Sequence, residues 1–198
     1  MNPLLPESAQ RDLVLASNSP RRAEILRRLE FDFDVVPAAD GIEEGVVNED
    51  SLERPLECAV LKSEDVATKR PDALCIGADT VVVHDGRLLG KPANDEAARR
   101  YLERLSGHTH TVISGLALRR LSSDTLLSGR ERTEVTFRKL SDDEIDRYVA
   151  CGEGRDKAGA YGIQGLGAAL VASVSGCYFN VVGLPVSLLF DLLKKASK

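Results

Sequence analysis

The chain has 198 residues, which is enough for one large domain or for two small lobes. Its net charge of −5, with 5% aromatic residues and no Trp, argues against a nucleic-acid-binding protein, which would usually carry a basic surplus and stacking side chains. The cysteines at 58, 75, 151 and 177 form no C-x-x-C pair, and residues 1–12 show no secretory signal. Together with the lack of a long apolar run, this predicts a cytoplasmic protein without a membrane span.

In the N-terminal half, short apolar runs of strand length alternate with helical stripes. Ser19 suits the N-cap and Pro20 the first position of a helix. Pro55 either is tolerated early in the next helix or marks its true start. In chain order we expect a flexible arm at residues 1–11, a strand at Leu13–Ala16, a helix from Pro20, a strand at Phe31–Val36, a helix at Ser51–Lys69 and a strand at Leu74–Val83.

Turn and capping signals organise the second half. Asp85-Gly86 predicts a hairpin, Asn94 and Gly107 bracket a helix, and Ser141 with Glu144 forms a capping box. We expect strands at Thr109–Leu118 and Leu126–Phe137, a helix at Asp142–Cys151, a glycine-rich loop at 152–167, strands at Leu170–Val174 and Phe179–Val182, and a helix from Pro185. Because βα units are mixed with hairpins, the pattern predicts an α/β fold: a mixed twisted sheet with flanking helices, and two lobes around a central cleft.

The segment Ser17-Asn18-Ser19-Pro20-Arg21-Arg22 joins a strand to a helix. A helix N-terminus carries partial positive charge and favours acidic residues, yet Arg21 and Arg22 occupy the first turn. An anion bound there would offset the repulsion, and a strand, a loop of small residues and a helix start together make a phosphate cradle. The alternative is a solvated surface pair of arginines.

Asp79 lies inside the otherwise apolar strand Leu74–Val83. A carboxylate is costly to bury there unless it is paired or bound to a metal. The pattern therefore indicates a general base or a metal ligand, and the alternative is a strand-end Asp that caps a turn. Lys91 could bind a phosphate, the Glu43-Glu44 pair could hold Mg²⁺, and Lys62 is a further candidate. Each of these, taken alone, is more simply a surface residue.

The segment Asp156–Gly167 has four glycines in nine residues, between positions 159 and 167. These predict close backbone approach or positive φ angles. Gln164 offers both a donor and an acceptor, which suits reading the edge of a base. A structural turn is the alternative, and it would explain the glycines but not Tyr161 and Gln164.

Taken in order, these segments resemble the Maf family of nucleotide pyrophosphatases. The similarity runs from about Leu13 to Leu193, and the Ser-x-Ser-Pro-Arg-Arg and Asp-Lys-Ala-Gly-Ala-Tyr-Gly-Ile-Gln-Gly segments are highly specific together. The resemblance implies one Maf-like domain over 1–198 with a fold similar to that of inosine-triphosphate pyrophosphatases. The matching pieces are Ser17–Arg22, Gly41–Glu44, Lys62, Gly77–Thr80, Gly90–Pro92, Leu105–Gly107, Asp156–Gly167 and Gly183–Pro185.

The resemblance implies hydrolysis of a nucleoside triphosphate between its α and β phosphates, dependent on Mg²⁺ or Mn²⁺. Asp79 matches the catalytic proton acceptor of the family, and Glu43 matches an acidic residue that would hold the metal together with Asp79. Whether Asp79 acts as base or as ligand is left open by the sequence. The implied substrate-binding positions are Ser17, Ser19, Arg21, Arg22, Lys62, Thr80, Lys91 and Gln164.

Arg21, Thr80 and Gln164 resemble the residues that distinguish the dTTP/UTP subgroup of the family. The implied substrates are therefore dTTP and UTP, with modified pyrimidine triphosphates as a further expectation. A homodimer without stable nucleic-acid partners is also expected. The alternative function is a nucleotide-binding regulatory module that affects septum formation in cell division.

Overall fold

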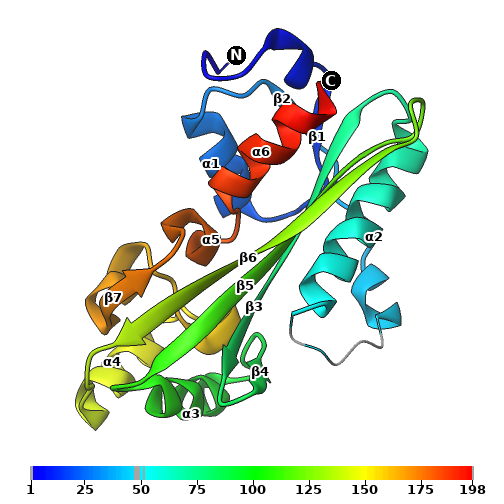
Figure 1. The fold of residues 1–198 in the computed structure, drawn as a ribbon. Coiled ribbons are helices and arrows are strands. Elements are labelled where there is room, and N and C mark those ends of the chain that lie inside the picture. Colours follow the sequence, from blue (N-terminus) through cyan, green and yellow to red (C-terminus); the bar gives the residue numbers. More distant parts are fainter. Residues whose placement is uncertain (1, 47–49, 51, 198) are drawn as a thin grey trace. The chain divides into compact units, whose positions relative to one another are not determined.

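The computed structural model describes residues 2–46, 50 and 52–197, and the strands of this part form one mixed sheet in the order β2-β1-β3-β5-β6-β7, with β4 paired to β3 (Figure 1). The predicted α/β class with a mixed sheet and flanking helices is confirmed. The strands are β1 (Leu13–Leu15), β2 (Phe33–Val35), β3 (Leu74–His84), β4 (Arg87–Leu89), β5 (Thr109–Arg120), β6 (Thr125–Phe137) and β7 (Val171–Ser175). The helices are α1 (Pro20–Arg28), α2 (Arg54–Lys69), α3 (Asp95–Leu105), α4 (Asp142–Cys151), α5 (Tyr178–Val182) and α6 (Val186–Ala196).

The chain divides into two compact units. The first comprises Met1–Asp79, Ser114–Glu131 and Gly183–Lys198, and the second comprises Thr80–Ile113 and Arg132–Val182. Short 3₁₀ helices complete the elements at η1 (Glu7–Ala9), η2 (Ile42–Gly45), η3 (Ala158–Ala160) and η4 (Gly165–Leu170). Among the described residues, no helix is both long enough and apolar enough to cross a bilayer.

In the first unit, β1 is the central parallel strand. Leu13 lies opposite Phe33 of β2 on one side and opposite Leu74 of β3 on the other. All three residues of β1 are buried, which explains why this strand is a continuous apolar run without alternation. Ser51 lies outside the described residues, and α2 begins at Arg54, so that Pro55 falls at the start of the helix, where a missing N–H costs nothing.

The N-terminal residues are packed onto the first unit. The Asn2 side-chain amide donates to the Leu29 carbonyl at 2.7 Å, and the Gln10 amide donates to the carbonyls of Asn2 and Leu5, both at 2.9 Å. Leu5 and Ala9 are buried. Two polar side chains thus bind backbone groups of the segment and two apolar ones are buried, while the flexibility expected for residues 1–11 stays a prediction.

The second unit shows the predicted turn and caps. Asp85 and Gly86 have φ angles of 48° and 71°, as a tight hairpin between β3 and β4 requires. Asn94 accepts the Ala97 N–H at 2.8 Å at the start of α3. At the start of α4, the Ser141 hydroxyl and Glu144 carboxylate form the reciprocal capping box that the sequence predicts.

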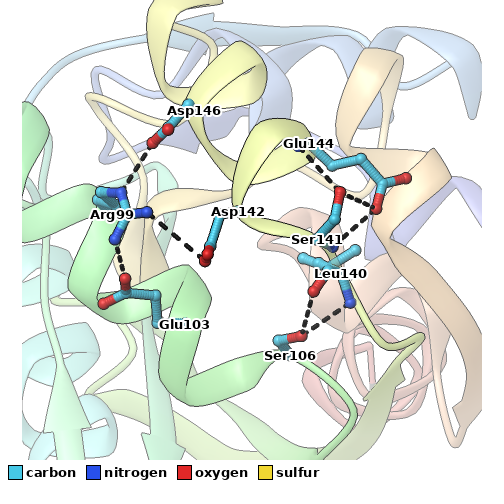
Figure 2. A network of polar contacts seen from close by, with 8 residues as sticks. All are labelled: Arg99, Glu103, Ser106, Leu140, Ser141, Asp142, Glu144 and Asp146. Carbon is cyan, nitrogen blue, oxygen red and sulfur yellow. Dashed lines mark hydrogen bonds and ion pairs between the residues drawn. The ribbon is translucent and has the colours of Figure 1, made fainter.

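Helices α3 and α4 are joined by polar contacts (Figure 2). Arg99 of α3 reaches Asp146 at 2.7 Å and Asp142 at 3.6 Å, both on α4, while it also contacts Glu103 on its own helix. The Leu140 N–H donates to the Ser106 hydroxyl at 2.8 Å, which links the end of α3 to the residue before the capping box. These contacts fix α4, which carries Tyr148 toward the glycine-rich segment.

The predicted strand at Phe179–Val182 is wrong, because Tyr178–Val182 forms the short helix α5. A short apolar run fits either a strand or a buried helical turn, so its sequence cannot decide between them. Within α5, Asn180 makes hydrogen bonds to residues of two strands. Its buried side chain donates to the Val112 carbonyl and to the Thr133 hydroxyl, both at 3.0 Å, and its N–H donates to the Cys177 carbonyl.

His110 of β5 lies in an aromatic cluster of the second unit. It is 2% exposed, packs edge-on against Phe137 and Tyr161, and has its Nε2 2.8 Å from the Tyr161 hydroxyl. Burial lowers the pKa of His110 to about 4, and the nearby His84 acts in the same direction. The imidazole is therefore neutral in the folded protein at physiological pH.

The free energy of unfolding is expected to fall as the pH is lowered from about 7 to 5. An unfolded histidine has a pKa near 6.5, so below that pH the unfolded chain binds a proton that folded His110 excludes until about pH 4. The loss amounts to roughly 2 kcal/mol at about pH 5. Urea denaturation at both pH values should show a smaller change for His110→Gln than for the unmodified protein, with exposed His108→Gln as the control. Equal changes in all three proteins would show that His110 does not cause the effect.

Candidate active site

In the first unit, the parallel strand β1 ends beside β3, which continues past this point to His84. Leu15, the last residue of β1, pairs with Ile76 of β3, and the Ala16 N–H donates to the Ile76 carbonyl at 2.9 Å. Ligands of parallel sheets bind beyond the carboxyl ends of the strands. Ser17 lies two residues after the end of β1, and Asp79 lies three residues after Ile76 in the same direction along β3, so both lie at the edge where β1 ends.

Helix α1 begins at this edge and turns Arg22 inward. Its Nη1 donates to the Ser17 hydroxyl at 2.9 Å and its Nε to the Gly183 carbonyl at 2.8 Å, while the Ser19 N–H donates to the same hydroxyl at 3.2 Å. Arg22 is only 9% exposed, so a solvated surface arginine does not describe it. Burial lowers the pKa of Arg22, and the negative charge of Asp79 opposes that effect, which places the two charges within electrostatic reach of each other.

Lys62 of α2 joins the two predicted acidic residues. Its Nζ lies 2.8 Å from Asp79 Oδ1 and also contacts Glu43 Oε1. The Lys62 and Asp79 side chains are 12% and 16% exposed, whereas that of Glu43, on η2, is 47% exposed. Asp79 is thus a paired carboxylate inside a strand, as expected from the cost of burying it alone. The alternative of a turn-capping Asp is not what the structure shows.

The position of Lys62 depends on close packing between α2 and the sheet. A Cβ on Gly77 of β3 would lie 2.0 Å from the Ala59 carbonyl oxygen, and a Cβ on Gly115 of β5 would lie 2.1 Å from that of Pro55. Only glycine lets the helix backbone come so near. Because α2 approaches this closely, Lys62 reaches Asp79, which lies two residues after Gly77.

The cations gathered here outnumber the carboxylates by one. Glu43 and Asp79 contribute two negative formal charges, and Arg21, Arg22 and Lys62 contribute three positive ones. A triphosphate therefore needs further cations. Two carboxylates that face one ammonium fit a divalent cation, since Mg²⁺ is usually bound by one or two carboxylates together with substrate phosphates. Within the described residues, no group of three or more His, Cys, Asp or Glu side chains could hold a metal by itself.

Cys58 of α2 is not suited to be a nucleophile. Burial raises its pKa to about 11, and the negative charges of Asp79 and Glu43 add to this increase. A thiol in such surroundings stays protonated at physiological pH, and only a thiolate is reactive. A covalent route through this cysteine is therefore not supported.

In the second unit, Lys91 is exposed and follows β4. The Gly159 N–H donates to the Gly90 carbonyl at 3.2 Å, which ties the turn before Lys91 to the glycine-rich segment. Gly159 has a φ of 72°, and a Cβ there would lie 3.1 Å from the Val82 side chain. Both observations explain a glycine at this position.

The segment that carries Gln164 is ordered by two residues that the sequence did not single out. Glu153 accepts the N–H groups of Leu166 and Gly167, both at 2.9 Å, and the Tyr148 hydroxyl accepts the Gly162 N–H at 3.1 Å. Gln164 itself is half-buried and precedes η4. A side chain that binds backbone amides leaves no sequence pattern, so only the nearby glycines could have pointed to these two residues.

The structure thus brings one group of predicted residues together in the first unit. Arg21 lies half-buried in the first turn of α1, and its charge acts on Arg22. Thr80, Lys91 and Gln164 belong to the second unit. The residues gathered in the first unit are Ser17, Ser19, Arg21, Arg22, Glu43, Lys62 and Asp79.

Known proteins resemble this chain in sequence over most of its length. Residues 12–196 match the family described as Maf-like protein. A protein from Pyrococcus furiosus named dTTP/UTP pyrophosphatase is 44% identical over 187 residues, covering 94% of this chain and 96% of that protein. One of the same name from Moorella thermoacetica is 50% identical over 182 residues, covering 91% and 93%. A solved dITP/XTP pyrophosphatase from Mycobacterium abscessus has 18% sequence identity and a TM-score of 0.41, covering 65% of this chain and 75% of that one.

Proposed function

Because the chain belongs to the Maf-like protein family, we propose that it is a nucleoside triphosphate pyrophosphatase that hydrolyses dTTP and UTP to the monophosphate and pyrophosphate. The observation that carries the proposal is the Lys62 ammonium 2.8 Å from Asp79 and in contact with Glu43, at the sheet edge where Arg22 is buried. The names of the relatives support the choice of substrate. Modified pyrimidine triphosphates are a further proposed class.

In the first unit, Asp79 orients and deprotonates the water that attacks the α phosphorus. The bond from that phosphorus to the bridging oxygen breaks, and pyrophosphate leaves. Lys62 holds Asp79 in place through the 2.8 Å contact, and Arg22 supplies donors to phosphate oxygens as negative charge builds on them. The first turn of α1, with Ser17, Ser19 and Arg21, completes the phosphate-binding surface.

A divalent cation, Mg²⁺ or Mn²⁺, would be held by Glu43 and Asp79. When bound it neutralises phosphate oxygens and the leaving group. The contact of Lys62 with both carboxylates supports this requirement, because they already offset the charge of its ammonium before a triphosphate binds.

In the second unit, Lys91 contributes a further positive charge for the phosphates, and Gln164 reads the base. Uracil and thymine present an acceptor, a donor and an acceptor on one edge, and an amide can match the donor and one neighbouring acceptor with its own acceptor and donor. We also propose that Thr80 and Arg21 contribute to substrate specificity. The expected homodimer and cytoplasmic location stay predictions.

Pyrophosphate release from a panel of nucleoside triphosphates tests the function. With Mg²⁺ present, dTTP and UTP are expected to react faster than dCTP, dATP and GTP, and EDTA in excess is expected to abolish release. Turnover that persists in EDTA would contradict the metal requirement alone. Binding of dTTP without any release would contradict the enzyme and favour the regulatory module.

A further inference from the structure

Glu153 lies just past the end of α4 and binds the backbone on the C-terminal side of Gln164. Its Oε1 accepts the Gly167 N–H and the Tyr148 hydroxyl, both at 2.9 Å, and its Oε2 accepts the Leu166 N–H at 2.9 Å. A carboxylate has acceptors only, so it can satisfy all three donors.

Tyr148 of α4 binds the backbone on the N-terminal side of Gln164. Its hydroxyl donates to Glu153 and accepts the Gly162 N–H at 3.1 Å. The hydroxyl and the carboxylate therefore form one connected network that binds amides both before and after Gln164. The Tyr148 ring is buried, and α4 itself is fixed by its contacts with α3 (Figure 2).

The glycines of the segment fit this network. A Cβ on Gly165, whose φ is 67°, would lie 2.7 Å from Glu153 Oε2. A Cβ on Gly167 would lie 2.7 Å from the Tyr148 hydroxyl and 2.1 Å from the Gly162 carbonyl oxygen. The positive φ and the nearby carboxylate explain Gly165, and the Gly162 carbonyl oxygen, with the Tyr148 hydroxyl behind it, explains Gly167, so part of the glycine pattern has a structural cause.

The electrostatics favour the ionised form of Glu153. Burial alone would raise its pKa, but the N–H groups of Gly167 and Leu166, the Tyr148 hydroxyl and the charge of Lys157 together outweigh burial and lower it. The network is therefore held by a charged acceptor, whose hydrogen bonds are stronger and shorter than neutral ones.

We propose that Glu153, with Tyr148, is the residue that positions Gln164 and thereby sets the selectivity for the base. This inference rests on the proposed function, because it needs Gln164 to read the substrate. Neither side chain is required to touch the nucleotide. Loss of the network should loosen residues 162–167, so that discrimination between bases falls, while the phosphate-binding residues of the first unit keep their own contacts.

The test is the ratio of kcat/KM for dTTP to kcat/KM for dCTP, measured with Mg²⁺. In Glu153→Gln an NH₂ group replaces one acceptor oxygen and cannot accept an amide N–H, so we expect the ratio to fall about tenfold while the value for dCTP changes by less than about threefold. Tyr148→Phe removes a single oxygen and is expected to lower the ratio in the same direction. Asp143→Asn, on the exposed face of α4, is the matched control and should keep the ratio.

Gln164→Ala separates this inference from the function on which it rests. If the unmodified enzyme prefers dTTP and Gln164→Ala removes the preference, the role of Gln164 in recognising the base is supported. Glu153→Gln with full preference, or with equal losses for both nucleotides, would then overturn the positioning role alone. If Gln164→Ala keeps the preference, then Gln164 does not recognise the base, and the positioning role of Glu153 is overturned as well. If Glu153→Gln does not fold, the same ratio of kcat/KM values, measured for Tyr148→Phe, tests the positioning role instead.

Discussion

Replacing Asp79 with asparagine is expected to lower kcat for dTTP by about two to four orders of magnitude, the usual range for a positioned base. Asparagine has the same shape but cannot accept the proton of the attacking water. The fold should persist, because Lys62 still contacts Glu43 and lies 3.5 Å from the Ala78 carbonyl oxygen. Pyrophosphate release at saturating dTTP and Mg²⁺ measures the loss, and a thermal denaturation curve checks the fold.

Asp34→Asn is the matched control for this substitution. Asp34 lies on β2 in the same unit, its side chain is 63% exposed, and it pairs with Arg70 at 2.9 Å. Exposed pairs of this kind contribute little to stability, so kcat should be unchanged. An Asp79→Asn enzyme that keeps full activity would remove Asp79 from the mechanism.

The way in which the rate of the Asp79→Asn variant depends on Mg²⁺ concentration separates the two roles left open by the sequence, those of base and metal ligand. If Asp79 serves mainly as a metal ligand, the variant needs more Mg²⁺ and regains much of its rate at high concentrations. If it serves as the base, saturating Mg²⁺ leaves the deficit in place. Mg²⁺ titrations of both proteins, followed by pyrophosphate release, distinguish these outcomes.

Local signals predicted much of the fold. The capping box of Ser141 and Glu144 gave α4 with its bounds, and Asp85-Gly86 gave the β3–β4 hairpin, because each of these features forms between residues close in the chain. The helix α5 was missed because a short apolar run fits either a strand or a helical turn, and the partners of its Asn180, Val112 and Thr133, are distant in sequence. Tertiary hydrogen bonds of this kind override local propensity.

The candidate site shows the same contrast between residues with a local sequence signal and residues whose role depends on tertiary contacts. Asp79 could be singled out because a carboxylate inside an apolar strand breaks a pattern. Lys62 carried no such signal, since a lysine on an amphipathic helix is ordinary; it became a candidate through the family resemblance, and the structure adds its contact with Asp79. Glu153 was missed altogether, because its partners are backbone amides and amides are present in every residue.

Gly77→Ala is expected to lower the free energy of unfolding by about 3 kcal/mol or more, as overpacking against a rigid neighbour does. The added carbon would lie 2.0 Å from the Ala59 carbonyl oxygen and 2.8 Å from the Ser63 nitrogen, so no flexible side chain can move aside. The helix α2 must then shift away from β3. That movement also carries Lys62 away from Asp79, now 2.8 Å apart, so kcat should fall together with stability. Urea denaturation and pyrophosphate release measure the two effects.

Gly115→Ala provides an independent version of the same test, because its Cβ would meet the Pro55 carbonyl oxygen of α2 at 2.1 Å. Gly45→Ala is the control: no atom lies within 4 Å of its added Cβ and its φ is not positive, so stability should stay within about 0.5 kcal/mol of the unmodified protein. If Gly77→Ala and Gly115→Ala denature at the same urea concentration as Gly45→Ala, then α2 does not depend on these two close approaches. The account of how Lys62 reaches Asp79 would have to be abandoned.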